Sequence, residues 1–156
     1  ELMNIVNCEL VKISTWFKLN KLSLNIKKTN FVLFGHKHID CNLDIYIVNT
    51  KIERVDKTKL LGIIINQSLT WNDHIAVIKQ KVLKSIGILS RLRDIVPQSV
   101  LLSLYHTMIS PYYDYCNIVW GINKCRALEN LFLSQKRAVR LITGSAYRSH
   151  TQGRIT

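Results

Sequence analysis

The chain of 156 residues is long enough to bury a core, and its apolar fraction of 47% is typical of a folded rather than a disordered protein. The longest apolar run falls far short of the ~20 residues that span a bilayer, so we expect no membrane partner and an intracellular location, nuclear or cytoplasmic. The net charge of +12, from 22 basic and 10 acidic residues, favours an anionic partner such as nucleic acid over a surface that is basic only for solubility.

The first part of the chain has the pattern of one helix followed by short strands. Residues 2–19 have an apolar side chain at every third or fourth position, which predicts an amphipathic helix packed on a sheet. The apolar positions are Leu2, Val6, Leu10, Ile13 and Phe17. Residues 31–34 then predict a strand, and residues 43–47 and 51–55 alternate as the two strands of a hairpin with its turn at residues 49–50.

The run 60–65 is almost wholly apolar and predicts a buried strand. Gly62 within it marks a point where another backbone or a ligand comes close. Shortly after this strand, Thr70 and Asp73 stand three residues apart, in the form of a capping box at a helix N-terminus. Beyond that point the apolar spacing changes from two residues to about 3.6, which indicates helices.

Three further helices are predicted. The first has one buried stripe, formed by Ile75, Ile78, Val82, Ile86, Leu89 and Leu92. Pro97 ends this helix and serves as the first residue of the next. The apolar face of the second helix is Val100, Leu101, Leu104, Tyr105 and Met108. The third runs from about 124 to 142 and is capped by Gly144. Its inward residues are Leu128, Leu131, Phe132, Gln135, Ala138, Val139 and Ile142.

The predicted fold class is therefore α+β, with an N-terminal helix and short antiparallel strands followed by an all-helical bundle. The change of period divides the chain into an α+β domain over residues 1–70 and a helical domain over residues 71–144. Residues 145–156 are polar without an apolar period and are expected to be frayed.

Common catalytic and nucleotide-binding motifs are absent: no G-x-x-x-x-G-K-[ST], G-x-G-x-x-G, G-x-S-x-G or H-E-x-x-H string occurs. The stretch from His36 to Cys41 has metal-binding side chains, but no second cluster completes four ligands, so we interpret it as a polar loop. None of the ten acids is paired in an apolar setting that would hold catalytic magnesium. The chain alone is therefore predicted to be inactive, with no cofactor of its own.

Several motifs together resemble the reverse transcriptases of non-LTR (LINE-type) retrotransposons. Trp16 and the string N-K-L-S-L-N-I-K-K-T at residues 20–29 are similar to the segment that follows the catalytic Asp-Asp turn in that family, and residues 31–34 supply the apolar strand that comes next. Residues 59–75, with K-L-L-G, L-T-W and H-I in order, are similar to the following block of the family. Further matches are Tyr105, Pro111, Tyr115, Cys116, Val119, Trp120, Gly121 and residues 135–140.

The resemblance implies a function for each part of the chain. Residues up to about 58 would be the C-terminal end of the polymerase palm. Leu60, Leu61 and Gly62 would form the primer grip, which holds the 3′ end of the growing strand. The helices after Trp71 would be the thumb, which lies along the template–primer duplex.

The resemblance also implies where catalysis would occur. Lys28 stands at the matching Lys-Thr position and would lie near the incoming deoxynucleoside triphosphate, as a general acid or charge stabiliser; a solvated loop lysine is the alternative. The catalytic aspartates are expected upstream of Glu1, and Mg²⁺ and the triphosphate are expected only in the intact polymerase.

The basic residues of the predicted helices are the candidates for contacts with an RNA–DNA or DNA duplex, since phosphate contacts supply affinity without sequence information. They are Lys79, Lys81, Lys84, Arg91, Arg93, Lys136, Arg137 and Arg140. The leading hypothesis is thus a fragment of an RNA-directed DNA polymerase that contributes primer grip and duplex binding. A basic nucleic-acid-binding module and a non-functional transposon relic are the alternatives.

Overall fold

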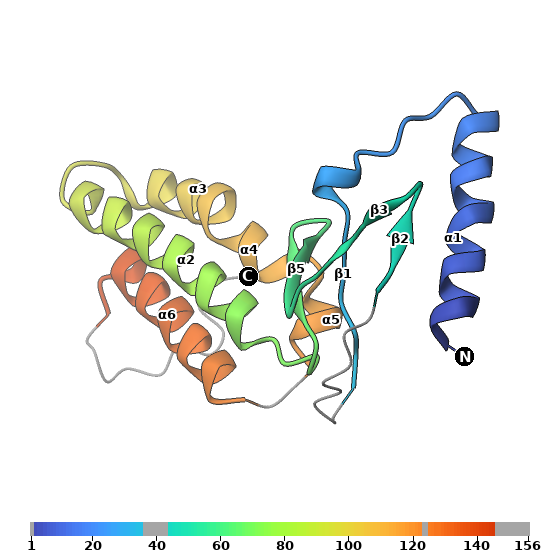
Figure 1. Cartoon of the computed structure of the whole chain (residues 1–156). Coiled ribbons are helices and arrows are strands. Elements are labelled where there is room, and N and C mark those ends of the chain that lie inside the picture. Colours follow the sequence, from blue (N-terminus) through green and yellow to red (C-terminus); the bar gives the residue numbers. More distant parts are fainter. Residues whose placement is uncertain (1, 36–43, 123–124, 146–156) are drawn as a thin grey trace. The chain divides into compact units, whose positions relative to one another are not determined.

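The computed structural model describes residues 2–35, 44–122 and 125–145, and the chain divides into two units at Thr70 and Trp71 (Figure 1). The fold is α+β, as the sequence predicts: short strands occur with helices in the first unit, and the second unit is helical. The polar stretch from His36 to Cys41 and the predicted tail beyond Ser145 lie outside the described residues. Among the described helices, none has the length and apolar character to cross a membrane.

The predicted N-terminal helix is confirmed as α1 (Leu2–Leu19). Its apolar stripe packs Val6 and Leu10 against a small core formed by Ile45, Ile47 and Ile52. The amide side chain of Asn7 fixes the helix to the adjacent strand, because its Oδ1 accepts a 3.0 Å hydrogen bond from Tyr46 N and its Nδ2 donates a 3.3 Å bond to Asp44 O. Ile13, predicted to face inward, is instead exposed.

Four two-residue strands follow α1 in the first unit, and β2 contacts the helix. They are β1 (Asn30–Phe31), β2 (Tyr46–Ile47), β3 (Thr50–Lys51) and β4 (Glu53–Arg54). The hairpin β2–β3 is antiparallel as predicted, but its turn lies one residue earlier than expected, at Val48 and Asn49, which both have positive φ. In contrast, β1 pairs with β4 in parallel, and the strand predicted over residues 31–34 ends after Phe31.

The apolar run 60–65 is not one buried strand, which corrects the sequence prediction. It is divided between β5 (Lys57–Leu60) and β6 (Ile63–Asn66), an antiparallel hairpin. Leu61 and Gly62 form the two-residue turn, with φ of 48° and 89°. Positive φ at both central residues is the requirement of the turn that best matches strand twist, and Gly62 meets it without strain. The tip is therefore exposed, by 57% at Leu60 and 82% at Leu61.

The predicted capping box is also absent. The long helix α2 (Asn72–Leu92) has Trp71 at its N-cap position, with no side-chain capping bond. Thr70 is instead bound to Asn66, whose Nδ2 donates to Thr70 Oγ1 at 2.7 Å and whose Oδ1 accepts from Thr70 N at 2.9 Å. The threonine hydroxyl therefore closes the turn before the helix, and the negative charge of Asp73 in the first turn favours the helix N-terminus.

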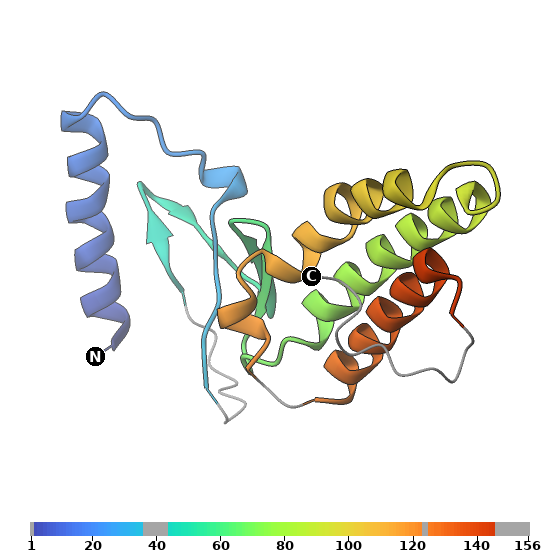
Figure 2. The same cartoon turned by 180° about the vertical axis from the view of Figure 1, so that it is seen from behind.

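The second unit is a helical bundle around the predicted stripe of α2. The other helices are α3 (Gln98–Met108), α4 (Ser110–Asp114), α5 (Asn117–Trp120) and α6 (Arg126–Thr143). Helix α2 packs on both α3 and α6, and the view from behind shows the same arrangement (Figure 2). The core contains Ile75, Ile78, Val82, Ile86, Leu89, Leu101, Tyr105, Ile109, Trp120, Leu131, Ala138 and Ile142.

The last two long helices differ from prediction in three places. Pro97 is the N-cap of α3 rather than its first helical residue, and Val100 on that helix is exposed. Phe132 is 50% exposed, whereas the buried position beside it belongs to Ser134, because the helix turns a narrower face inward than its apolar residues suggest. Gly144 caps α6 as predicted, with φ of 64°.

Candidate nucleic-acid interface

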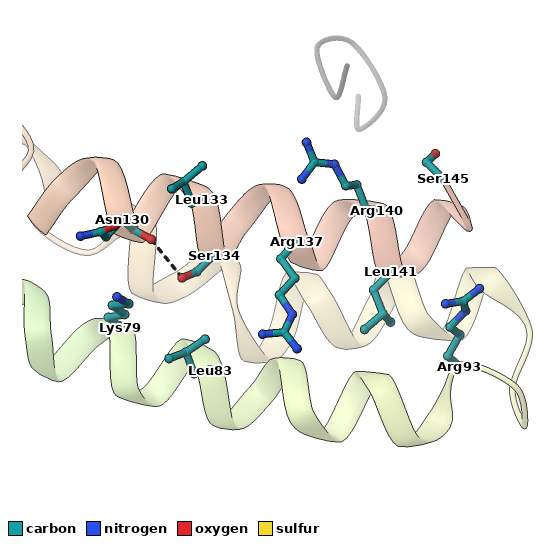
Figure 3. Close-up of a pocket in the computed structure, with 10 residues that line it drawn as sticks. All are labelled: Lys79, Leu83, Arg93, Asn130, Leu133, Ser134, Arg137, Arg140, Leu141 and Ser145. Atoms are coloured by element: carbon teal, nitrogen blue, oxygen red, sulfur yellow. Dashed lines mark hydrogen bonds between the residues drawn. The ribbon is translucent and has the colours of Figure 1, made fainter. Parts of the chain in front are cut away.

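A groove of about 470 Å³ runs between α2 and α6 in the helical unit (Figure 3). The two helices run in the same direction, and side chains from both face the space between them. The described residues that line it are Lys79, Leu83, Arg93, Asn130, Leu133, Ser134, Arg137, Arg140, Leu141 and Ser145. Four of these are cationic and none is acidic, so the groove is a concentrated positive surface.

Helix periodicity explains which residues of α2 reach the groove. Lys79 and Leu83 follow buried Ile75 at intervals of four residues, and the small drift of an α-helix per turn moves them to the flank of the buried stripe. Arg93 stands at the C-cap of the same helix. Its Nε lies 3.9 Å from Asp94 Oδ1, and both side chains are exposed, so this ion pair is too weak to neutralise the arginine.

Helix periodicity also explains which residues of α6 line the groove. Arg137 and Leu141 are one turn apart, and Figure 3 shows Arg137 extending from α6 toward α2, with Leu141 pointing the same way. Ser134 is buried at the base, where its hydroxyl donates a 3.1 Å hydrogen bond to the carbonyl of Asn130. Arg140 lies on the rim, pointing away from α2.

The structure brings together four of the eight basic residues that the sequence predicts as nucleic-acid ligands. These four are Lys79, Arg93, Arg137 and Arg140. Lys84, Arg91 and Lys136 are exposed but do not line the groove. Lys81 lies on the opposite flank of α2, with its ammonium 5.3 Å from the centroid of the Tyr112 ring.

The apolar residues of the groove are the part that sequence reasoning missed. Leu83 and Leu133 lie beside the cationic residues but outside both predicted stripes. A signal was present, since Leu83 follows Lys79 by four residues and Leu133 precedes Arg137 by four, which places each pair on one helical face. What the sequence lacks is the information that α2 and α6 are neighbours.

The remaining predicted site residues lie in the first unit. Lys28 is exposed at the end of a single 3₁₀ turn, Ile26–Lys28. Leu60, Leu61 and Gly62 form the exposed tip of the β5–β6 hairpin. All four residues are therefore accessible to solvent, and the roles predicted for them stay predictions.

The part of the chain that the structure describes holds no group of three or more His, Cys, Asp or Glu side chains placed to bind a metal ion. A catalytic Mg²⁺ site needs carboxylate oxygen ligands, and we derive no catalytic step from the described residues.

Comparison with known proteins gives one informative similarity. The chain is 26% identical over 137 residues to the probable RNA-directed DNA polymerase from transposon X-element of Drosophila melanogaster, a match that covers 85% of this chain and 15% of that protein. The chain thus spans only about 15% of the length of this relative. No family model and no solved structure matches the chain. The similarity supports the resemblance to reverse transcriptases and makes the chain a distant relative of a transposon polymerase.

Proposed function

We propose that this chain is part of an RNA-directed DNA polymerase of a non-LTR retrotransposon, in which the α2–α6 groove binds the backbone of the template–primer duplex. The observation that carries the proposal is the groove itself, with four cations from two helices and no acid among its described lining residues. The similarity to a transposon polymerase over 85% of the chain supplies the biological context.

The chemistry of the groove suits phosphates. Lysine and arginine side chains bind phosphate oxygens and release condensed counterions, which gives affinity that is independent of base sequence. From Lys79 to Arg93 the groove extends along about 14 residues of helix, or roughly 21 Å. At about 3.4 Å per nucleotide along one strand, this length matches roughly six nucleotides.

The first unit would supply the contacts at the primer end. In this proposal the exposed hairpin tip at Leu61 and Gly62 is the primer grip, and Lys28 approaches the triphosphate. Polymerisation itself, with Mg²⁺ and deoxynucleoside triphosphates, would belong to the whole polymerase, of which this chain corresponds to a small part.

Fluorescence anisotropy of the 156-residue chain with a labelled RNA–DNA hybrid, measured across a salt series, tests the proposal. Four phosphate contacts predict a slope of log affinity against log salt of about −3.6, or roughly a 150-fold loss between about 50 and 200 mM salt. If all eight predicted basic residues made contacts, the slope would be about −7. Absence of binding at low salt, or binding that does not change with salt, would contradict the proposal.

A further inference from the structure

A second pocket lies in the helical unit, where the short helices α4 and α5 meet the N-terminal half of α6. Its volume is about 330 Å³, at the lower end of the range of about 300–1,000 Å³ that is usual for ligand-binding pockets. Its apolar wall is formed by Ile118, Trp120, Ile122, Leu128, Leu131 and Phe132. We call it the α5–α6 pocket, and it shares no described lining residue with the α2–α6 groove.

Three large apolar side chains of this wall are open to solvent. Ile118 is 78% exposed, Ile122 is 74% exposed, and Phe132, which the sequence predicts to be buried, is 50% exposed. Single exposed apolar side chains are normal on a protein surface, but several gathered at one pocket mark a site of interaction with another protein segment. Such a segment covers the pocket and its exposed edge together, which a small molecule inside the pocket does not.

Short α5 is held firmly against the helical unit. The indole Nε1 of buried Trp120 donates a 2.9 Å hydrogen bond to Tyr115 O. At Gly121 a Cβ atom would lie 2.6 Å from the backbone oxygen of Asn117, so the chain leaves α5 by a close approach that excludes a side chain. The two exposed isoleucines on either side of Trp120 are therefore presented by a well-anchored segment, which lowers the cost of ordering them when a partner binds.

The charge of the pocket differs from that of the basic surface around it. Asp114 lines the pocket, and none of the described lysines and arginines does. The Asp114 carboxylate is exposed and accepts a 3.0 Å hydrogen bond from the Ser110 hydroxyl, which leaves its charge in place. Glu129 and Lys136 stand one turn before and one turn after Phe132 on α6, with opposite charges. A phosphate or an acidic peptide therefore has no cation to bind among the described residues of this pocket.

We propose that the α5–α6 pocket binds a basic amphipathic helix that another part of the polymerase supplies. Apolar side chains at every third or fourth position of that helix fill the pocket and cover the exposed isoleucines and Phe132, and a lysine or arginine beside them pairs with Asp114. The chain spans 15% of the length of the transposon polymerase to which it is similar, so most of such a protein lies outside it. The net charge of +12 opposes the docking of a second copy of this chain.

This inference rests on the part of the proposed function that makes the chain a piece of a larger polymerase, and it does not depend on the α2–α6 groove. Anisotropy of the full 156-residue chain with labelled synthetic peptides tests it. The probe is a peptide of about 15 residues, long enough to form a helix, with leucine at every third or fourth position and lysine elsewhere. One control peptide replaces every leucine with alanine, and another replaces every lysine with glutamate.

We expect saturable binding of the leucine–lysine peptide and none of the alanine–lysine peptide, which has the same charge but no large apolar face. The leucine–glutamate peptide is attracted to the basic surface of the chain, and its binding should not depend on residues of the pocket. Absence of binding by the leucine–lysine peptide, or equal binding by the alanine–lysine peptide, would overturn the inference.

Three variants locate the bound peptide. Ile118→Ser should weaken binding of the leucine–lysine peptide about tenfold, as loss of a central apolar contact does. Asp114→Asn should weaken it about threefold, the usual effect of one exposed ion pair. Ile95→Ser is the control and should have no effect, since Ile95 is similarly exposed at 76% and does not line the pocket. Equal effects of Ile118→Ser and Ile95→Ser would overturn the inference.

Two other occupants of the pocket would give different results. Tighter binding of the leucine–glutamate peptide that Ile118→Ser abolishes would indicate an acidic partner. A dimer that forms with increasing concentration and is lost in Ile118→Ser, measured by sedimentation velocity, would indicate a second copy of the chain. Either result would overturn the inference.

Binding of the RNA–DNA hybrid separates this inference from the proposed function. Ile118→Ser should leave the affinity and the salt slope for the hybrid unchanged, because Ile118 does not line the α2–α6 groove. A wild-type chain that binds the hybrid but not the leucine–lysine peptide would overturn the inference about the pocket alone. A chain that binds the peptide at the pocket but not the hybrid would support this inference and contradict the proposed role of the groove.

Discussion

The phenol of Tyr113 donates a 3.0 Å hydrogen bond to the carbonyl oxygen of Leu131. The bond is buried and ties the short helix α4 to the N-terminal half of α6, the helix that forms one wall of the groove. Burial raises the pKa of Tyr113 far above its ordinary value, so the phenol stays a neutral donor across the physiological range. The position of α6 therefore depends on contacts made on the side away from the groove.

Removal of this hydroxyl should destabilise the helical unit. We expect Tyr113→Phe to lower the free energy of unfolding by about 1 kcal/mol, the usual net value of a buried hydrogen bond. Urea denaturation followed by circular dichroism measures the change. Tyr112→Phe is the control, because the ring still lies under the Lys81 ammonium, and it should change stability by less than about 0.5 kcal/mol. Equal effects of the two substitutions would contradict the role assigned to Tyr113.

The buried His74 should make stability depend on pH. Burial lowers the pKa of His74, with a smaller contribution from the positive charge of Lys81. The imidazole packs in a T-shaped arrangement with the Trp120 ring, with the two ring centroids 5.8 Å apart. In the unfolded chain the pKa returns to about 6.5, so the unfolded state binds more protons below that pH. The contribution to stability is therefore present above the unfolded pKa and is lost as the pH falls through it toward the lower folded value.

The variant His74→Phe keeps a ring beside Trp120 but cannot titrate. Urea midpoints of the wild type and of the variant, measured between about pH 8 and pH 5, should show a steeper fall for the wild type. The same pH dependence in both proteins would show that another group is responsible.

The hairpin tip offers a test that separates stability from function. Leu61 has a φ of 48°, which is strained for a residue with a side chain like leucine. Leu61→Asn creates Asn-Gly, the preferred pair for this turn, and should raise the free energy of unfolding by about 0.5–1 kcal/mol. The melting temperature reports this gain. Leu60→Asn, in the adjacent strand, is the control and should give none.

The same variant also tests the proposed primer grip. If the exposed Leu61 side chain contacts nucleic acid, Leu61→Asn should weaken binding of an RNA–DNA hybrid in spite of its greater stability. Unchanged affinity in anisotropy measurements would argue against contact at the tip.

The core of the helical unit should be sensitive to truncation at α2. Leu89 is fully buried, and Leu89→Ala should lower the free energy of unfolding by about 2–5 kcal/mol, because the lost contacts leave a cavity. Ile88→Ala, one residue earlier on the exposed side, should cost much less. Similar costs at both positions would contradict the packing of α2, and chemical denaturation distinguishes the two outcomes.

The sequence predicted the elements of the fold better than their ends and pairings. The stripe from Ile75 to Leu89 is a strong periodic signal because one face of a long helix is buried along its whole length. The hairpin at residues 57–66 was hidden because a two-residue turn with only one glycine leaves an apolar run unbroken. The parallel pairing of β1 with β4 depends on contacts between distant segments, which no local pattern records.

The candidate site was predicted only in part, because it also depends on contacts between distant segments. The side-chain type and the helical period identified Lys79 and Arg137 as basic residues outside the apolar stripes. It could not separate them from Lys84 and Lys136, which have the same chemistry on other faces. Which cations share a groove is decided by the packing of α2 against α6, a tertiary relationship.

The most direct test of the central claim compares two charge-matched double variants in the salt series with an RNA–DNA hybrid. One is Lys79→Gln with Arg137→Gln, which removes one groove cation from each helix; the other is Lys84→Gln with Lys136→Gln, which removes one outer cation from each. The groove account predicts that the first variant reduces the salt slope by about 2 and weakens binding, while the second leaves the slope close to wild type. An equal change in both variants would show that net charge, and not the α2–α6 groove, binds the nucleic acid.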